Sequence, residues 1–501
     1  MTSADTTRSV RPRALRPASV GRASDVPDDD SLVVVANRLP VRRVRRRSGT
    51  VWETSPGGLV SALVPILERR RVTWVGWAGL KSRRTPPFRH DGIDNVPVPL
   101  SGDEVEAYYE GFSNRVLWPL FHGALRAPEL RRSWWEAYRT INARFATEAA
   151  AAAPRGATVW IHDYHLMLVP ALLRDRRPDV RIGFFLHIPF PPEELFSRLP
   201  WRRELLAGLL GADVVGLQTR RDEQNLRALL EDSASDRGAS RAPVVETFPI
   251  SVDFERWERA SRSEKVLRRS ASLRRRLGTS RTILLGVDRL DYTKGIDARL
   301  RAYQRLLREG TIAAEETVLV QAAVPSREGV AEYVEQRRLV ERLAGELNGE
   351  FGEIGRSVVH SMHRNFGFEE LVALYLAADV LLVTPLRDGM NLVAKEYVAS
   401  RVDERGVLVL SEFAGAAAEL NEAMLVNPFD PEGLAARIAG AIRAPDGESA
   451  ARMRALRRVV RERDVFRWAD TFLERLSGAG TRGGRASDRP SRSAGADAGD
   501  R

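Results

Sequence analysis

The sequence predicts an α/β protein of two domains, each built on a parallel sheet covered by helices. The chain has 501 residues, which is more than a single hydrophobic core usually serves. Short apolar runs alternate with longer helical patterns, and this alternation is typical of strand–helix–strand units. The expected strands are Leu32–Ala36, Thr73–Trp77, Thr158–Ile161, Ile182–Leu186, Val214–Leu217, Ile283–Val287, Thr317–Ala323, Val380–Val383 and Val407–Leu410.

Helical patterns lie between most of these runs, for example at Glu194–Arg198, Arg221–Glu231, Leu300–Glu309 and Val330–Leu347. At residues 255–280 Glu, Arg and Ser replace apolar residues, and we place the hinge between the domains there. The predicted organisation is an N-terminal domain over residues 31–255, a C-terminal domain over 256–463 and a last helix over 464–476. The flanking residues 1–30 and 477–501 have almost no large apolar side chains, so we expect them to be disordered.

Composition limits the class of protein. The chain has no cysteine, which excludes disulfides, a thiol nucleophile and thiolate metal sites. It contains no run of eighteen apolar residues, and residues 1–30 lack the apolar stretch of a secretory signal. We therefore expect a cytoplasmic enzyme with no membrane association.

The net charge of +11 raises the possibility of a nucleic-acid-binding protein. The arginine clusters at residues 42–47 and 268–276 carry no interleaved aromatic residues, which a single-strand binding surface would have. We expect solvated surface charge and no specific nucleic-acid partner. The chain also contains only four lysines, Lys81, Lys265, Lys294 and Lys395, beside 74 arginines. A lysine that persists in such a chain is a candidate for a role that requires a compact ammonium.

The segment from Thr384 to Tyr397 predicts a strand, a tight loop and a helix, with the loop at the carboxyl end of the strand. Ligands of doubly wound sheets bind at such ends. Asp388 on the loop can accept hydrogen bonds from sugar hydroxyls, and Glu396 can take the paired hydroxyls of a ribose. The amides of Met390, Asn391 and Leu392 would face an anion at the start of the helix. The alternative is an ordinary turn with a capping acid.

The segment Val287–Gly295 also follows a strand and precedes a helix, and it carries Arg289 and Lys294. Both cations can reach one diphosphate, where they would stabilise the charge of a departing nucleotide. The alternative is a pair of surface cations neutralised by Asp288 and Asp291. His187 follows a third expected strand, in a loop that Pro189, Pro191 and Pro192 restrain.

These segments together resemble the trehalose-6-phosphate synthases, retaining glycosyltransferases of family 20 with the GT-B architecture. The resemblance runs from about residue 31 to 476. It implies two facing Rossmann-like domains with the active site in the cleft between them, and a last helix that returns to the N-terminal domain. The implied donor-binding residues are Gly58, in the Gly57–Gly58 pair, with His187, Arg289, Lys294, Asp388, Gly389, Met390, Asn391, Leu392 and Glu396.

The resemblance also implies an acceptor site and a reaction. Arg38, Tyr109, Trp118 and Arg327 would hold the acceptor phosphate, and Asp163 and Trp77 would contact the acceptor sugar. His187, Arg289, Lys294 and Asp163 would be the catalytic residues. The implied reaction moves glucose from a nucleoside diphosphate glucose, most simply UDP-glucose, to glucose 6-phosphate, which gives α,α-trehalose 6-phosphate. The anomeric configuration would be retained by attack on the same face, with the leaving phosphate accepting the proton.

No metal or cofactor is expected. His162 and His165 form an H-x-x-H pair, but no third ligand is evident and the segment matches a metal-free motif. Three alternatives stay open: a related transferase for glycerol 3-phosphate or a cyclitol phosphate, a non-catalytic sugar-phosphate sensor, and a basic nucleic-acid-binding protein. The sequence leaves the donor base open among uracil, guanine and adenine, and a homo-oligomer is compatible with it.

Overall fold

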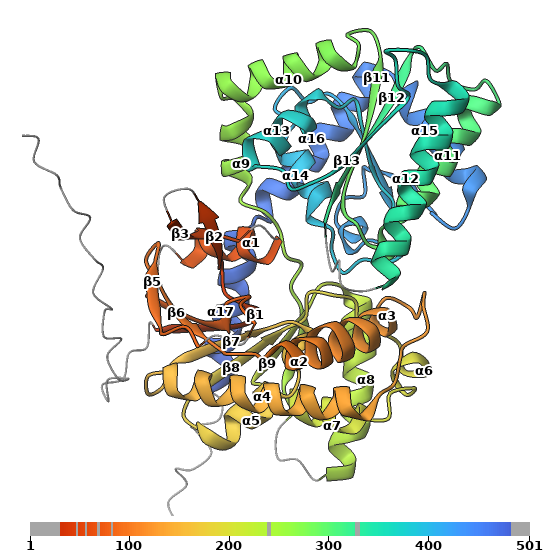
Figure 1. Cartoon of the computed structure of the whole chain (residues 1–501). Coiled ribbons are helices and arrows are strands. Elements are labelled where there is room, and N and C mark those ends of the chain that lie inside the picture. Colours follow the sequence, from red (N-terminus) through yellow and green to blue (C-terminus); the bar gives the residue numbers. More distant parts are fainter. Residues whose placement is uncertain are drawn as a thin grey trace, which may run out of the picture.

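Two sheets organise the chain, each with helices on both faces (Figure 1). The computed structural model describes residues 31–46, 49–55, 58–67, 71–81, 84–237, 242–325 and 331–481. The expected positions Gly57 and Arg327 and the two predicted tails up to residue 30 and from 482 lie outside these residues. Within the described ranges, no helix combines the length and apolar character needed to cross a membrane.

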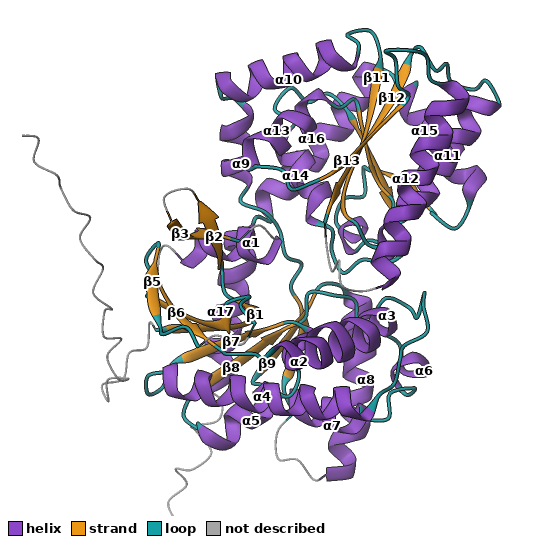
Figure 2. Ribbon diagram, viewed as in Figure 1, coloured by secondary structure: helices purple, strands orange, loops and turns teal. Residues whose placement is uncertain are grey.

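The first sheet has the strand order β10-β9-β8-β7-β1-β4-β6-β5, and all neighbours are parallel except β5 and β6. Strands of this sheet are drawn in orange in the lower part of Figure 2. Its strands are β1 (Leu32–Arg38), β4 (Val72–Trp77), β5 (Phe88–His90), β6 (Ile93–Pro97), β7 (Thr158–His162), β8 (Arg181–Phe185), β9 (Val214–Leu217) and β10 (Val244–Thr247). A separate antiparallel hairpin is formed by β2 (Val41–Arg46) and β3 (Gly49–Thr54).

The first domain contains the helices α1 (Gly58–Leu67), α2 (Gly102–Glu104), α3 (Trp118–Phe121), α4 (Arg132–Ala152), α5 (Val169–Arg176), α6 (Glu193–Phe196), α7 (Arg202–Leu209) and α8 (Arg220–Arg237). A π-helix, η1 (Val105–Leu117), and a 3₁₀ turn, η2 (Tyr164–Leu166), complete it.

The second sheet is parallel throughout, in the order β13-β12-β11-β14-β15-β16. Its strands are β11 (Thr282–Arg289), β12 (Thr317–Val324), β13 (Val359–His363), β14 (Val380–Val383), β15 (Val407–Ser411) and β16 (Met424–Val426). The helices that follow the first sheet are α9 (Phe254–Ser261), α10 (Glu264–Leu277), η3 (Tyr292–Lys294), α11 (Ile296–Arg308), α12 (Ala331–Phe351), α13 (Phe368–Ala377), α14 (Leu392–Ser400), η4 (Gly415–Ala418), α15 (Pro431–Ile442), α16 (Asp446–Glu462) and α17 (Val465–Thr481).

All strands expected from the sequence are present, because each is an apolar run buried on both faces of a parallel sheet. In the two large sheets, the strands that the sequence did not indicate are β5, β6, β10, β13 and β16, at or next to the sheet edges. Edge strands are short and carry polar residues, as in Val359–His363, so their hydrophobic pattern is weak.

The stretch in which we expect the hinge is helical. Residues 255–280 form α9 and α10, which pack against α13 and α14 of the second domain. The chain crosses earlier, between Thr247 and Phe254. The Arg- and Glu-rich composition reflects the solvent-facing sides of these two helices, where Arg268 pairs with Glu264 and Arg262 with Glu258.

The last helix, α17, packs against α1, β8 and β9 of the first domain. The ring centroids of Trp468 and Phe472 lie 5.0 Å and 4.8 Å from that of Trp160 on β7. The helix continues beyond the predicted end at Leu476 to Thr481, because Leu476 and Ala479 are both buried against its neighbours.

A buried ion pair joins the two crossings between the domains. Lys395 Nζ lies 2.6 Å from Glu419 Oε2, and both side chains are at most 5 % exposed. The same ammonium donates to the carbonyl of Ile250 in the first crossing, at 2.8 Å. In the second crossing, Arg463 donates to Glu419 Oε1 at 3.2 Å. Lys395 therefore fixes where both connecting segments leave the second domain.

Replacing Lys395 by Met should destabilise the protein, because Glu419 would lose its fully buried partner. We expect a loss of about 3–5 kcal/mol in the free energy of unfolding, measured in urea. Lys265 is the matched control: its Nζ lies at the same 2.6 Å from Glu369 Oε2, but the two side chains are 73 % and 46 % exposed. Lys265→Met should cost no more than about 1 kcal/mol. Equal losses in the two variants would contradict the role of Lys395.

Candidate active site between the two domains

The carboxyl ends of the two parallel sheets face each other, and the expected site residues follow the strands there (Figure 1). In the second domain Arg289 ends β11, Lys294 lies in η3, and Asp388 follows β14. In the first domain Asp163 follows β7 and His187 follows β8. Parallel strands place all these groups at one edge of each sheet, which is where such sheets bind ligands.

Lys294 and Asp388 form an ion pair with 2.6 Å between Nζ and Oδ2, and both side chains are largely buried. Asn391 Nδ2 also donates to Asp388 Oδ2, at 3.1 Å. Burial by itself would raise the pKa of Asp388, but the ammonium of Lys294 lowers it below its usual value. Asp388 is therefore ionised and can accept hydrogen bonds from hydroxyls near neutral pH.

The alternative partners considered for Arg289 and Lys294 are occupied elsewhere. Asp288 binds Arg299 at 2.6 Å in the core, and Asp291 accepts from the amide and hydroxyl of Thr293. Within the described residues, Arg289 has no carboxylate at ion-pair distance. Its side chain is exposed, with the guanidinium carbon 5.2 Å from the ring centroid of Trp118 in the first domain. A predicted donor residue and a predicted acceptor residue thus meet across the cleft.

The loop after β14 approaches the first domain closely. A β-carbon at Gly389 would collide with the carbonyl oxygen of His187, so only glycine fits there. Gly58, at the start of α1, is near the same loop: a β-carbon there would lie 3.2 Å from Leu392 Cδ1. Met390 is buried and its carbonyl accepts from the amide of Ala416. The predicted donor residues of both domains therefore lie next to one another.

Asn391 begins α14 in a left-handed conformation with φ 78°, and its side chain accepts from the amide of Ala394 at 3.3 Å. This cap fixes the turn that presents the first amides of the helix, including Leu392, toward the cleft. One turn further, Glu396 Oε2 accepts from the hydroxyl of Tyr375 at 2.8 Å. Burial raises the pKa of Glu396 to about 7, while the hydroxyl of Tyr375 offsets part of this effect.

Three of the predicted acceptor residues, Arg38, Trp77 and Tyr109, form an aromatic and cationic cluster at the end of β1. The guanidinium of Arg38 lies 3.9 Å from the ring centroid of Trp77 and 5.7 Å from that of Tyr109. Trp77 is buried, and its indole nitrogen donates to the carbonyl of Leu80 at 3.1 Å. Its ring is therefore a platform that holds Arg38 rather than an open surface for a sugar.

The π-helix η1 has aromatic side chains in two different environments. Tyr108 and Phe112 are fully buried in the core, whereas Tyr109 is half-buried beside Arg38 and stacks on His165 at 5.8 Å. Tyr108 and Phe112 thus pack in the core, and Tyr109 lies outside it beside Arg38. π-Helical turns are rare and concentrate at functional sites.

Asp163 and His187 hold each other at the base of the cleft. Asp163 has φ 77°, and its Oδ1 accepts from the amide of His187 at 3.2 Å. The imidazole of His187 has a partner that the sequence did not indicate: its Nε2 lies 3.0 Å from Nδ1 of His162. Burial lowers the pKa of His187 to about 3, so its ring is neutral. In the described part of the chain, no group of three His, Cys, Asp or Glu could hold a metal.

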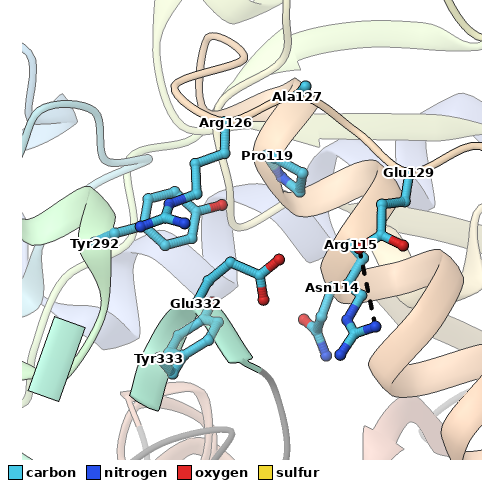
Figure 3. A pocket seen from close by; sticks show the side chains of 9 residues that line it. All are labelled: Asn114, Arg115, Pro119, Arg126, Ala127, Glu129, Tyr292, Glu332 and Tyr333. Atoms are coloured by element: carbon cyan, nitrogen blue, oxygen red, sulfur yellow. Dashed lines mark ion pairs between the residues drawn. The ribbon is translucent and has the colours of Figure 1, made fainter. Parts of the chain in front are cut away.

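A pocket lies where η1 and α3 meet η3 and α12 (Figure 3). Arg126 spans it: its guanidinium lies 5.2 Å from the ring centroid of Tyr292 and 3.2 Å from Glu335 Oε2. Arg115 faces Glu129 on the opposite wall, at 3.9 Å. The contacts of Arg126 join the first domain to the second, whereas the Arg115–Glu129 pair lies within the first domain.

Two parallel α/β domains with charged and aromatic groups on facing strand ends have the architecture of GT-B glycosyltransferases. The family model for glycosyltransferase family 20 matches residues 30–478. The chain is 52 % identical over 469 residues to the trehalose-6-phosphate synthase of Mycolicibacterium smegmatis, covering 90 % of this chain and 93 % of the relative. It is 51 % identical over 477 residues to that of Mycobacterium avium, covering 91 % and 97 %.

Solved structures that are similar to this chain also include trehalose-phosphate synthases. A UDP-forming α,α-trehalose-phosphate synthase from Burkholderia xenovorans, in complex with glucose-6-phosphate, has a TM-score of 0.83 at 33 % identity and covers 89 % of this chain and 100 % of its own. The Escherichia coli trehalose-6-phosphate structure bound with UDP-2-fluoro glucose has a TM-score of 0.79 at 34 % identity, covering 89 % and 98 %. The chain belongs to glycosyltransferase family 20. The predicted family and fold are confirmed.

The raised pKa of Glu396 makes a prediction about stability. A carboxyl that binds its proton more tightly in the folded chain adds stability below its unfolded pKa, and this is lost as the pH rises through about 7. Glu396→Gln cannot lose that proton. We expect the variant to gain thermal stability relative to the wild type as the pH rises from about 5 to about 8. A difference in melting temperature that is constant over this range would contradict the assignment.

Proposed function

We propose that the chain is a retaining glucosyltransferase that moves glucose from a nucleoside diphosphate glucose to glucose 6-phosphate and forms α,α-trehalose 6-phosphate. The observation that carries the proposal is the contact of Arg289 with Trp118 across the cleft, which joins a diphosphate-binding loop to an acceptor-binding helix. The relatives with about half of their residues identical are named for this product. UDP is the favoured nucleotide, since the related Burkholderia structure is that of a UDP-forming enzyme.

Arg289 and Lys294 are the proposed ligands of the donor diphosphate. As the bond to glucose breaks, charge accumulates on the departing phosphate, so cations held beside it stabilise the transition state more than the ground state. Lys294 can donate to phosphate while it keeps Asp388, because an ammonium has three donors. Asp388, Gly389 and His187 would surround the glucose, and Glu396 would accept from the ribose.

The acceptor phosphate is assigned to Arg38, Tyr109, Trp118 and Arg327. Trp77 holds Arg38 from below at 3.9 Å, so the guanidinium edge stays available for a phosphate fork. Asp163, fixed by the amide of His187, would accept from the acceptor hydroxyls. A phosphorylated hexose carries both the phosphate and the hydroxyls that these two groups of residues would bind.

The mechanism we propose uses no covalent nucleophile on the protein. Asp388 is engaged by Lys294 and Asn391, and Asp163 by the His187 amide, so neither carboxylate is presented as a nucleophile. The acceptor hydroxyl would attack on the face that the nucleotide leaves and pass its proton to the leaving phosphate. The protein then acts by positioning, charge and exclusion of water between the domains. We propose a metal-independent reaction in the cytoplasm, with Arg289 and Lys294 supplying the positive charge.

Removing the diphosphate contact should disable transfer. Arg289→Ala should lower kcat by about 100-fold or more, as the loss of a transition-state donor does elsewhere. Arg301, which is exposed on α11, is the control, and Arg301→Ala should retain wild-type turnover. Product is measured as trehalose 6-phosphate from UDP-glucose and glucose 6-phosphate. Near-normal turnover in Arg289→Ala with an unchanged melting temperature would remove Arg289 from the site.

Removing a proposed ligand of the acceptor phosphate should weaken the binding of glucose 6-phosphate and not that of UDP-glucose. Arg327→Ala should raise the KM for glucose 6-phosphate by about tenfold or more, because a charged hydrogen bond to phosphate is worth about 1.5–3 kcal/mol. The KM for UDP-glucose should stay within about twofold. The opposite pattern would reassign Arg327 to the donor.

A further inference from the structure

His162 is a buried histidine that the proposed mechanism does not use. It is the last residue of β7, it is fully buried, and its Nδ1 lies 3.0 Å from Nε2 of His187. The two rings stack with 5.3 Å between their centroids. Burial, followed by the neighbouring His187, lowers the pKa of His162 well below its usual value. Both rings are therefore neutral, and one proton must lie between the two nitrogens.

The backbone of His187 is already fixed on both sides. Its amide donates to Asp163 Oδ1, and its carbonyl meets the loop at Gly389. These contacts do not determine which ring nitrogen of His187 carries the proton. Because Nε2 is taken by His162, Nδ1 is the nitrogen of His187 that is left for a ligand in the cleft.

The shared proton can be placed in two ways. If His187 Nε2 carries it, then His162 is protonated on Nε2 and the Nδ1 of His187 is a bare acceptor. If His162 Nδ1 carries it, then His162 Nε2 is a bare lone pair, and His187 is protonated on Nδ1 and can donate to a ligand. The environment of His162 Nε2 decides between the two.

His162 Nε2 is buried and has no hydrogen-bond partner among the described residues. The indole nitrogens of Trp160 and Trp468, in the same aromatic cluster, are buried and unpartnered in the same way. An indole nitrogen can only donate. A proton on His162 Nε2 would add a third buried donor without a partner to this cluster, whereas a bare Nε2 adds none. An unpaired buried N–H is the rarer and costlier arrangement.

We propose that His162 is a positioning residue: its Nδ1–H donates to His187 Nε2 and holds His187 as the tautomer whose Nδ1–H points to the donor sugar. The contact with the sugar rests on the proposed function, while the tautomer does not. The consequence is a fixed polarity. His187 gives a hydrogen bond to an oxygen of the glucose and cannot accept one, so the sugar hydroxyl it meets keeps its own proton for another acceptor.

The tautomer is tested without substrate, by ¹⁵N NMR of the full chain labelled on its imidazole nitrogens. The chain has seven histidines, and the signals of His162 and His187 are identified by their loss in His162→Asn and His187→Asn. We expect a protonated, pyrrole-type Nδ1 and a bare, pyridine-type Nε2 for both residues at neutral pH. A protonated Nε2 on His162 would overturn the proposal, whatever the enzyme's activity. This outcome is separate from failure of glucose transfer, which would count against the proposed function alone.

Kinetics test the consequence for the reaction. His162→Phe keeps an aromatic ring and removes the donor, and kcat/KM for UDP-glucose should fall by about tenfold or more, as it does when a residue that orients a functional histidine is removed. The KM for glucose 6-phosphate should not change. His162→Asn places an amide N–H near the position of Nδ1 and should return kcat/KM to within about threefold of wild type. The reverse pattern, near-normal kcat/KM in His162→Phe and a loss in His162→Asn at equal melting temperatures, would show that the ring is needed only for packing and would overturn the proposal.

Discussion

The site exists because two backbones from different domains touch at one point, Gly389 against the carbonyl of His187. The loop that carries Gly389 is held to its own domain by backbone hydrogen bonds: the amide of Asp388 donates to the carbonyl of Phe413, and that of Gly415 to the carbonyl of Asp388. Any side chain at position 389 would separate the domains. Asp388, Lys294 and Glu396 would then move away from His187 and Asp163, and the cleft would no longer contain one site.

Near this contact several charged side chains are buried, where the loss of hydration is unfavourable, and three of them are paired with a carboxylate. Lys294 binds Asp388, Lys395 binds Glu419 and Arg299 binds Asp288, all at 2.6 Å with little or no exposure. Such pairs give little net stability, since desolvation offsets most of their attraction, but breaking one is costly. They instead fix geometry. Arg299 positions the loop of β11, Lys395 fixes the two crossings, and Lys294 holds Asp388 ready for a ligand.

The few lysines of the chain lie in different environments. Lys294 lies in the candidate site, as its motif indicated, and Lys395 is buried beneath it as a structural anchor. Lys265 is an exposed partner of Glu369. A lysine can donate in three directions from one compact atom, and Lys395 uses this to reach a carbonyl and a carboxylate at once. Scarcity by itself therefore did not mark a role: Lys294 and Lys395 are buried ammonium groups, whereas Lys81 and Lys265 are exposed.

Local sequence patterns were enough to predict the two sheets and the family. They also predicted the strand–loop–helix units that carry Arg289, Lys294, Asp388 and Glu396. Apolar runs with fixed periods and motifs at strand ends are properties of neighbouring residues, so a sequence displays them directly. Edge strands such as β13 were hidden because their pattern is weak. The partners Tyr375 for Glu396, Trp118 for Arg289 and His162 for His187 join residues far apart in the chain. Only the tertiary structure decided these contacts, two of them within a domain and that of Arg289 with Trp118 between the domains, because burial, pKa and tautomer depend on which groups meet in space and not on their spacing along the chain.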